Sequence, residues 1–84
     1  MSQIENIDVP YFMPGRLYKI IQEKLLYKQD SLHRAYNIAK PGDIILIIGR
    51  YDIKGYDTLK LMYGTEILHI FIFYDTKHKI VELK

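Results

Sequence analysis

The feature that most constrains the fold is a Gly-Thr pair at positions 64 and 65, which separates two apolar segments, 58–63 and 66–73. Glycine at the first position of a two-residue loop is typical of a type II′ β-hairpin, because that position needs a positive φ. A two-residue loop also determines which residues lie opposite each other. The sequence therefore predicts an antiparallel hairpin in which Lys60 is opposite His69.

The two faces of this hairpin differ in character. One is purely aliphatic and is predicted to face the core; it carries Leu59, Leu61, Leu68, Ile70 and Ile72. The opposite face is mixed, with Lys60 and His69 among Met62, Ile67, Phe71 and Phe73. Contiguous apolar side chains on an exposed face usually mark an interface. We therefore predict that these last four residues form an interface, covered either by another part of this chain or by a second protein.

Further turn signals divide the rest of the C-terminal part. "KPGD" at 40–43 predicts a type II turn, in which Pro41 presets φ and Gly42 supplies the positive φ. The continuous apolar run 44–48 then predicts a strand over 43–51 that is covered on both faces, with a bulge or bend at Gly49. A loop is expected at 51–57, a turn or single 3₁₀ turn started by Asp75 at 74–79, and a last strand at 80–84.

The N-terminal part is ambiguous. Residues 1–15 contain two prolines, which break helices and favour extended backbone, so we predict an N-terminal arm. Residues 16–20 suit a short strand, but the apolar spacing also fits a helix over 16–27. Residues 22–40 are interpreted as a long connection.

Composition narrows the class of protein. With 84 residues, 49% of them hydrophobic, the chain forms a single domain with a dense core. It has no cysteine, and its longest apolar run is too short to cross a bilayer. The first residues lack the basic and apolar segments of a secretory signal, so we expect no such signal and no membrane association. A net charge of +2 is too small to indicate nucleic-acid binding by itself.

Three sequence motifs occur in a recognisable order: "GRLY" at 15–18, "PGDIILIIG" at 41–49, and "LMYG" with "LHI" between 61 and 70. In these the chain resembles small SH3-like β-barrel proteins, especially uncharacterised ones from tailed bacteriophages, over residues 14–84. The resemblance implies an all-β fold, a five-stranded SH3-like barrel at 16–84 with a long first loop after the arm. It also implies a binding or scaffold role without a catalytic motif, in the cytoplasm of a host cell or in a virion. The alternative is an α+β domain in which a helix at 16–27 packs on an antiparallel meander.

In such a barrel the two long loops flank a groove. We predict that the groove-lining residues bind a partner, because Tyr and Arg are enriched at binding hot spots; they are Tyr27, Tyr36, Arg50, Tyr51 and Tyr56. The predicted function is protein binding or self-association, as a virion or assembly protein or as a phage inhibitor of a host protein. An equally simple interpretation is that these tyrosines are ordinary amphipathic surface.

A small nucleic-acid-binding barrel is the alternative function. Basic residues interleaved with aromatics can hold phosphates and stack bases. The candidate phosphate contacts are Lys19, Lys24, Lys28 and Arg34, which lie near Tyr18, Tyr27 and Tyr36 in the sequence. The simpler interpretation is that these lysines keep a loop solvated while the tyrosines pack beneath it.

Catalytic patterns are absent from the sequence. His33, His69 and His78 have no metal-ligand spacing, and there is no cysteine and no G-x-S-x-G nucleophile motif. Asp52 and Asp57 lie in one predicted loop and could form a pair of carboxylates, but loop aspartates mostly cap turns or are solvated. We therefore expect a protein that is not an enzyme and binds neither metal nor cofactor.

Overall fold

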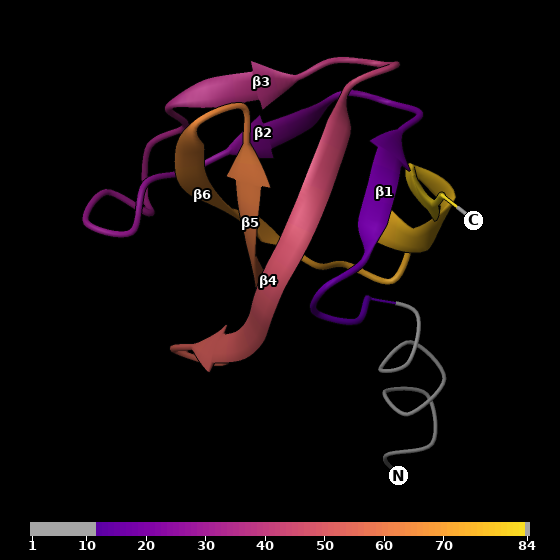
Figure 1. Cartoon of the computed structure of the whole chain (residues 1–84). Coiled ribbons are helices and arrows are strands. Elements are labelled where there is room, and N and C mark those ends of the chain that lie inside the picture. Colours follow the sequence, from indigo (N-terminus) through magenta and orange to yellow (C-terminus); the bar gives the residue numbers. More distant parts are fainter. Residues whose placement is uncertain (1–11, 84) are drawn as a thin grey trace, which may run out of the picture.

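The computed structural model describes residues 12–83, so residues 1–11 of the predicted arm lie outside the described part. The elements are β1 (Leu17–Ile20), β2 (Lys24–Leu26), β3 (Asn37–Ala39), β4 (Ile44–Ile53), β5 (Tyr56–Tyr63), β6 (Glu66–Phe71), the 3₁₀ turn η1 (Thr76–His78) and β7 (Ile80–Glu82) (Figure 1). The expected all-β class is confirmed for this part of the chain.

The alternative helix over 16–27 is wrong, because those residues form β1 and β2. Burial along β1 alternates with a period of two: Tyr18 and Ile20 are buried, whereas Leu17 and Lys19 are exposed. This alternation is the pattern of a strand with one face on the core. Of the four residues that fit a helical stripe in the sequence, Leu17, Ile20, Ile21 and Leu25, only Ile20 is buried.

The strands form two antiparallel sheets. Five strands are ordered β6-β5-β4-β1-β7, and β2 pairs only with β3. The β2–β3 hairpin lies within residues 22–40, which the sequence predicts to be a long connection. Among the described residues the sheets do not close into a barrel. The structure establishes a small, compact, mostly β protein.

The register predicted for the β5–β6 hairpin is confirmed. Lys60 is the Cα partner of His69, and Gly64 has a φ of 63°, as a type II′ loop requires. The aliphatic face is buried as expected, with Leu59, Leu61, Leu68 and Ile70 at 0–1% exposure. Ile72 is only partly buried but packs against the same core. The turn at 40–43, with Gly42 at a φ of 96°, and the 3₁₀ turn after Asp75 also form where predicted.

The predicted loop at 51–57 is wrong. β4 continues to Ile53 and β5 begins at Tyr56, so only Lys54 and Gly55 connect the strands. Both have positive φ, 53° and 88°, which is the conformation of a type I′ hairpin turn. Gly55 adopts this conformation at low cost, and it lets the two strands pair up to the turn.

β4 carries the predicted irregularity near Gly49. The register with β5 shifts between Ile47 and Gly49, which is the signature of a β-bulge. Before the bulge, Ile45 and Ile47 face the core; after it, Gly49 and Tyr51 lie on the outer face with Lys60. The bulge thus changes which face successive residues of β4 occupy.

The core lies between the inner face of the five-stranded sheet and the β2–β3 hairpin. Leu26 and Ala39 of the hairpin are fully buried in the same cluster as the sheet residues. Phe12, at the end of the predicted arm, is also buried there, with its ring centroid 5.7 Å from that of Tyr18. The outer face of the sheet is left to form the surfaces considered next.

Candidate binding groove

A groove with a volume of about 830 Å³ lies between the loop that follows β2 and the ends of β4, β5 and β6. One wall is made by the loop residues Gln29, Asp30, Leu32 and His33. The other wall is the end of β4 and the β4–β5 turn, with Tyr51, Asp52, Ile53 and Lys54. Between the walls are the aromatic residues Tyr56, Phe71 and Phe73.

Sheet register places these aromatic residues together. Tyr51 and Phe71 are the Cα partners of Thr58 on either side of it, so a small buried residue separates two large ones. Tyr56 lies two residues before Thr58 on β5, and its ring centroid is 5.7 Å from that of Phe71. Tyr56 and Phe73 are 58% and 53% exposed, respectively, so the aromatic surface is open to a partner.

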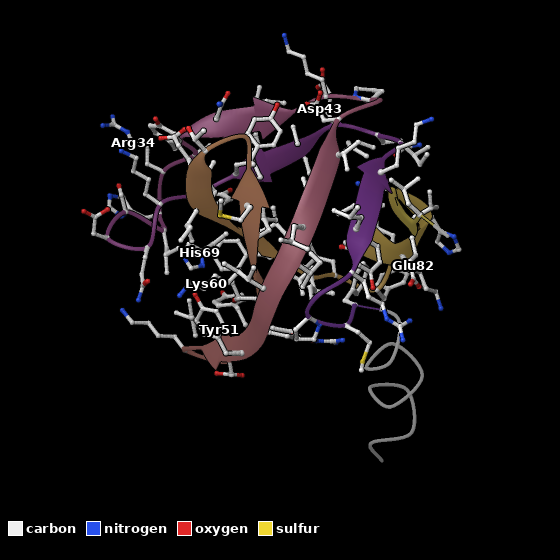
Figure 2. All side chains as sticks on the ribbon, in the orientation of Figure 1. Arg34, Asp43, Tyr51, Lys60, His69 and Glu82 are labelled. Atoms are coloured by element: carbon white, nitrogen blue, oxygen red, sulfur yellow. The ribbon has the colours of Figure 1, made fainter. Side chains whose placement is uncertain are left out.

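Beneath the groove, His69 holds Tyr51. The His69 ring is 1% exposed, and its Nδ1 lies 2.5 Å from the Tyr51 hydroxyl oxygen. The two rings meet edge to face, with centroids 5.8 Å apart. Burial, and to a lesser extent the charge of Lys60, lowers the pKa of His69, while burial raises the pKa of Tyr51. Figure 2 shows these three side chains at one end of the sheet, away from Asp43.

Tyr27, predicted to line the groove, instead supports it from behind. Its backbone and that of His69 exchange two hydrogen bonds, each with an N–O distance of 2.8 Å. The Tyr27 ring packs against Phe71 with centroids 5.0 Å apart. The loop wall that follows Tyr27 is therefore attached to the edge of β6.

Two other predicted groove residues lie elsewhere. The Tyr36 hydroxyl donates to the Glu66 carboxylate over 2.7 Å, and the Lys28 ammonium sits 4.3 Å from the Tyr36 ring centroid. Arg50 faces inward and donates to both carboxylate oxygens of Asp57, at 3.1 and 2.6 Å. Of the five residues predicted to line the groove, only Tyr51 and Tyr56 do so.

The predicted interface residues separate into two surfaces. Phe71 and Phe73 belong to the groove, whereas Met62 and Ile67 do not. The latter two end a row of apolar side chains that crosses β1, β4, β5 and β6 through paired positions and begins at Leu83, the residue after β7: Leu83, Leu17, Leu46, Met62 and Ile67. The mixed face of the hairpin is covered by this chain only in part: His69 is 1% exposed, whereas Ile67 is 50% exposed.

The candidate phosphate contacts do not form one patch. Lys19 lies on β1, Lys28 is over Tyr36, and Arg34 points away from the body of the molecule (Figure 2). Only Lys24 reaches the groove region: its ammonium is 5.4 Å from the Phe73 ring centroid and 3.4 Å from the Phe71 carbonyl oxygen. Burial, followed by the charge of Lys79, lowers the Lys24 pKa.

Carboxylates and histidines of the described residues do not converge. No group of three His, Cys, Asp or Glu within 12–83 is placed to hold a metal ion. Asp52 and Asp57 are Cα partners in the β4–β5 hairpin, but Asp57 is bound by Arg50, and Asp52 accepts the Gly55 amide at 2.8 Å. Both carboxylates therefore stabilise the hairpin.

Sequence reasoning missed the loop wall at 29–33 and the role of His69. The wall depends on the pairing of Tyr27 with His69, residues far apart in the sequence that show no local signal. The opposite wall had a usable signal, since Gly55 sits between residues suited to strands and predicts a tight turn.

Across residues 12–83, no helix has the length and apolar character needed to cross a bilayer. Comparisons with protein-family models, curated proteins and solved structures gave no match to this chain. The proposed function is therefore inferred from the groove.

Proposed function

We propose that this protein acts by binding another protein and that the groove between the 29–33 loop and the β4–β5 turn is the contact surface. The observation that carries the proposal is the open aromatic surface in that groove: Tyr56 and Phe73 are each more than half exposed, at 58% and 53%. Aromatic side chains bury a large area with little loss of conformational freedom, which is why they are enriched where proteins meet.

The shape and chemistry of the groove suit an extended segment of a partner. Two walls flank an aromatic floor, and each wall carries polar groups: Asp30 and His33 on the loop, Asp52 and Lys54 on the turn. Apolar contacts in the centre supply affinity, while polar groups at the rim orient the bound segment. A surface already formed by paired strands also reduces the entropic cost of binding.

The biological setting that we propose is that of a non-enzymatic assembly factor, a virion component or an inhibitor of a host protein, in the cytoplasm of a host cell or in a virion. We further infer an SH3-like architecture. The order of the elements supports it: a short strand, a long first connection, three strands joined by tight turns, a 3₁₀ turn and a closing strand.

Site-specific photo-crosslinking tests the proposal. A benzoylphenylalanine placed at Tyr56 or Phe73 should form an adduct with the same partner in the native setting. The same group at Tyr74, which is 85% exposed but does not line the groove, is the matched control and should not. Adducts from position 74 or 67, with none from 56 and 73, would place the contact elsewhere.

Nucleic-acid binding is the second candidate function. The observation that favours it is the contact of Lys24 with the exposed ring of Phe73, because a cation beside an open aromatic face can hold a phosphate while a base stacks. Titration with single- and double-stranded oligonucleotides at two salt concentrations tests it. Binding that weakens steeply with salt and with Lys24→Gln supports this function, and no binding at low salt removes it.

A further inference from the structure

We propose that His69 is a positioning residue that holds both walls of the groove, and that its protonation loosens them, so that the groove is complete only while His69 is neutral. His69 does not line the groove itself. It lies directly beneath, where its side chain and its backbone reach opposite walls.

The side chain of His69 acts on the wall formed by β4. Its Nδ1 is 2.5 Å from the hydroxyl oxygen of Tyr51, which lines the groove. In the tautomer that carries its proton on Nε2, neutral His69 accepts this hydrogen bond at Nδ1. The hydrogen bond and the edge-to-face packing of the rings, 5.8 Å apart, restrict Tyr51 to one orientation.

The backbone of His69 acts on the loop wall. The two 2.8 Å hydrogen bonds between His69 and Tyr27 attach the chain just before residues 29–33 to β6. Beyond Tyr27, the next residues that contribute to the groove are Gln29 and Asp30. One buried residue therefore anchors two walls that come from distant parts of the sequence.

Protonation disturbs this arrangement for two reasons. An imidazolium at a site that is 1% exposed loses hydration, and the Tyr51–His69 hydrogen bond has to reverse, with the Tyr51 hydroxyl turning its own proton away so that its oxygen accepts from Nδ1–H. The titratable groups around His69 do not compensate: Tyr51 faces it from β4, Lys60 from β5 and Tyr27 from the segment after β2. Lys60 is itself a cation and opposes a second positive charge. The groups lining the groove above are Asp30, His33, Asp52 and Lys54.

Opening the Tyr27–His69 contact or displacing Tyr51 gives the charged ring access to water, so acidification favours such states. Burial lowers the pKa of His69 below its ordinary value of 6.5. Between pH 6.5 and that lowered pKa, each pH unit shifts a closed-to-open equilibrium up to about tenfold toward the open state. The consequence for partner binding rests on the proposed function of the groove, whereas the opening itself does not.

Amide hydrogen exchange tests the opening without any partner. The amides of Tyr27 and His69 report the two backbone bonds directly, and the Ile20 amide, which is bonded to the Asp43 carbonyl at 2.8 Å between β1 and the start of β4, reports opening elsewhere. After correction for intrinsic exchange rates, protection at Tyr27 and His69 should fall by about tenfold per pH unit below pH 6.5, while protection at Ile20 changes less.

Two variants separate the titration from the packing. His69→Asn keeps an acceptor near the position of Nδ1 but cannot become charged, so its Tyr27 protection should not depend on pH. Tyr51→Phe keeps the ring and the burial of His69 and removes the hydroxyl, so the His69 pKa, measured by NMR, should stay below 6.5, and the fall of Tyr27 protection with acid should persist. The NMR spectrum of the unaltered protein should also show an unprotonated Nδ1 at neutral pH.

Protection at Tyr27 that is constant from pH 7 to pH 5, or an Nδ1 that carries the proton in the neutral ring, would overturn the proposal, even if His69→Asn failed to fold. Crosslinking from position 56 that persists while exchange shows no opening would overturn the pH coupling but leave the proposed function intact. A pH-dependent opening with no crosslinked partner would leave the coupling intact and count against the proposed function.

Discussion

The Tyr63 hydroxyl, at the end of β5, donates a 2.5 Å hydrogen bond to the Asp43 carboxylate, and the same carboxylate oxygen accepts the Lys40 amide over 2.8 Å. One carboxylate thus joins the turn before β4 to the neighbouring strand. The Tyr63 hydrogen bond, followed by that of Lys40, holds the pKa of Asp43 below its ordinary value of 3.8. The contact lies at the end of the sheet opposite the groove (Figure 2).

The first prediction concerns acid stability. Because the folded-state pKa of Asp43 is lowered, its contribution to stability is present above about pH 3.8 and is lost as the pH falls through the folded value. Tyr63→Phe, which removes only the hydroxyl, should lower the free energy of unfolding at pH 7 by about 0.5–1 kcal/mol. Urea denaturation at pH 7 and pH 3 measures this, and a loss of the same size at both values would contradict the ionic origin.

The second prediction concerns the pH dependence that His69 adds at higher pH. Its lowered pKa means that the unfolded chain binds a proton more readily than the folded protein. The free energy of unfolding should therefore be constant above pH 6.5 and decrease as the pH falls from 6.5 toward the folded value. Denaturation of the unaltered protein and of His69→Asn at pH 7.5 and 5.5 checks this, because only the unaltered protein should lose stability from this source.

The third prediction concerns the turn that forms one groove wall. Lys54 is the only non-glycine residue within 12–83 with a positive φ, at 53°. Asparagine tolerates this conformation better and Asn-Gly is the favoured type I′ pair, so Lys54→Asn should raise the free energy of unfolding by about 0.5–1 kcal/mol. Gly55→Ala, at a φ of 88°, should lower it by about 1–2 kcal/mol. A thermal denaturation series measures both, and a stabilising Gly55→Ala would show that the turn is not of this type.

The fourth prediction compares the two faces of the hairpin. Leu61 is fully buried and Ile67 is 50% exposed. Leu61→Ala should lower the free energy of unfolding by about 2–5 kcal/mol, while Ile67→Ala should change it by no more than about 0.5 kcal/mol. Chemical denaturation at several protein concentrations gives both values. A large, concentration-dependent effect of Ile67→Ala would reveal self-association through the row that ends at this residue.

Local signals were sufficient for the hairpin at 64–65, the turn at 40–43 and the bulge near Gly49, because glycine conformation and strand alternation act over a few residues. They were insufficient for residues 16–27. The spacing of Leu17, Ile20, Ile21 and Leu25 suggests a helical stripe, but only Ile20 is buried and the other three are 42–47% exposed in the folded protein. Pairing of 17–20 with β4 and β7, and of 24–26 with β3, determines the backbone there.

The candidate site was only half predictable for the same reason. Tyr51 and Tyr56 were identified by residue type, and Phe71 and Phe73 by hairpin alternation, but as members of two separate surfaces. Only the pairing of β4 with β5 beyond residue 50 brings them together. That pairing depends on a turn at Lys54-Gly55, where one strained residue precedes the glycine and weakens the signal.

The bulge between Ile47 and Gly49 determines which residues at the end of β4 face the groove. The extra residue at this point places Tyr51 on the outer face and Arg50 on the inner one. If the same residues formed a regular ladder with Ile48 opposite Lys60, the two would be exchanged, and a cation would replace an aromatic ring opposite Thr58 and beside Phe71. The irregularity of β4, and not only its residue content, therefore makes this part of the groove aromatic.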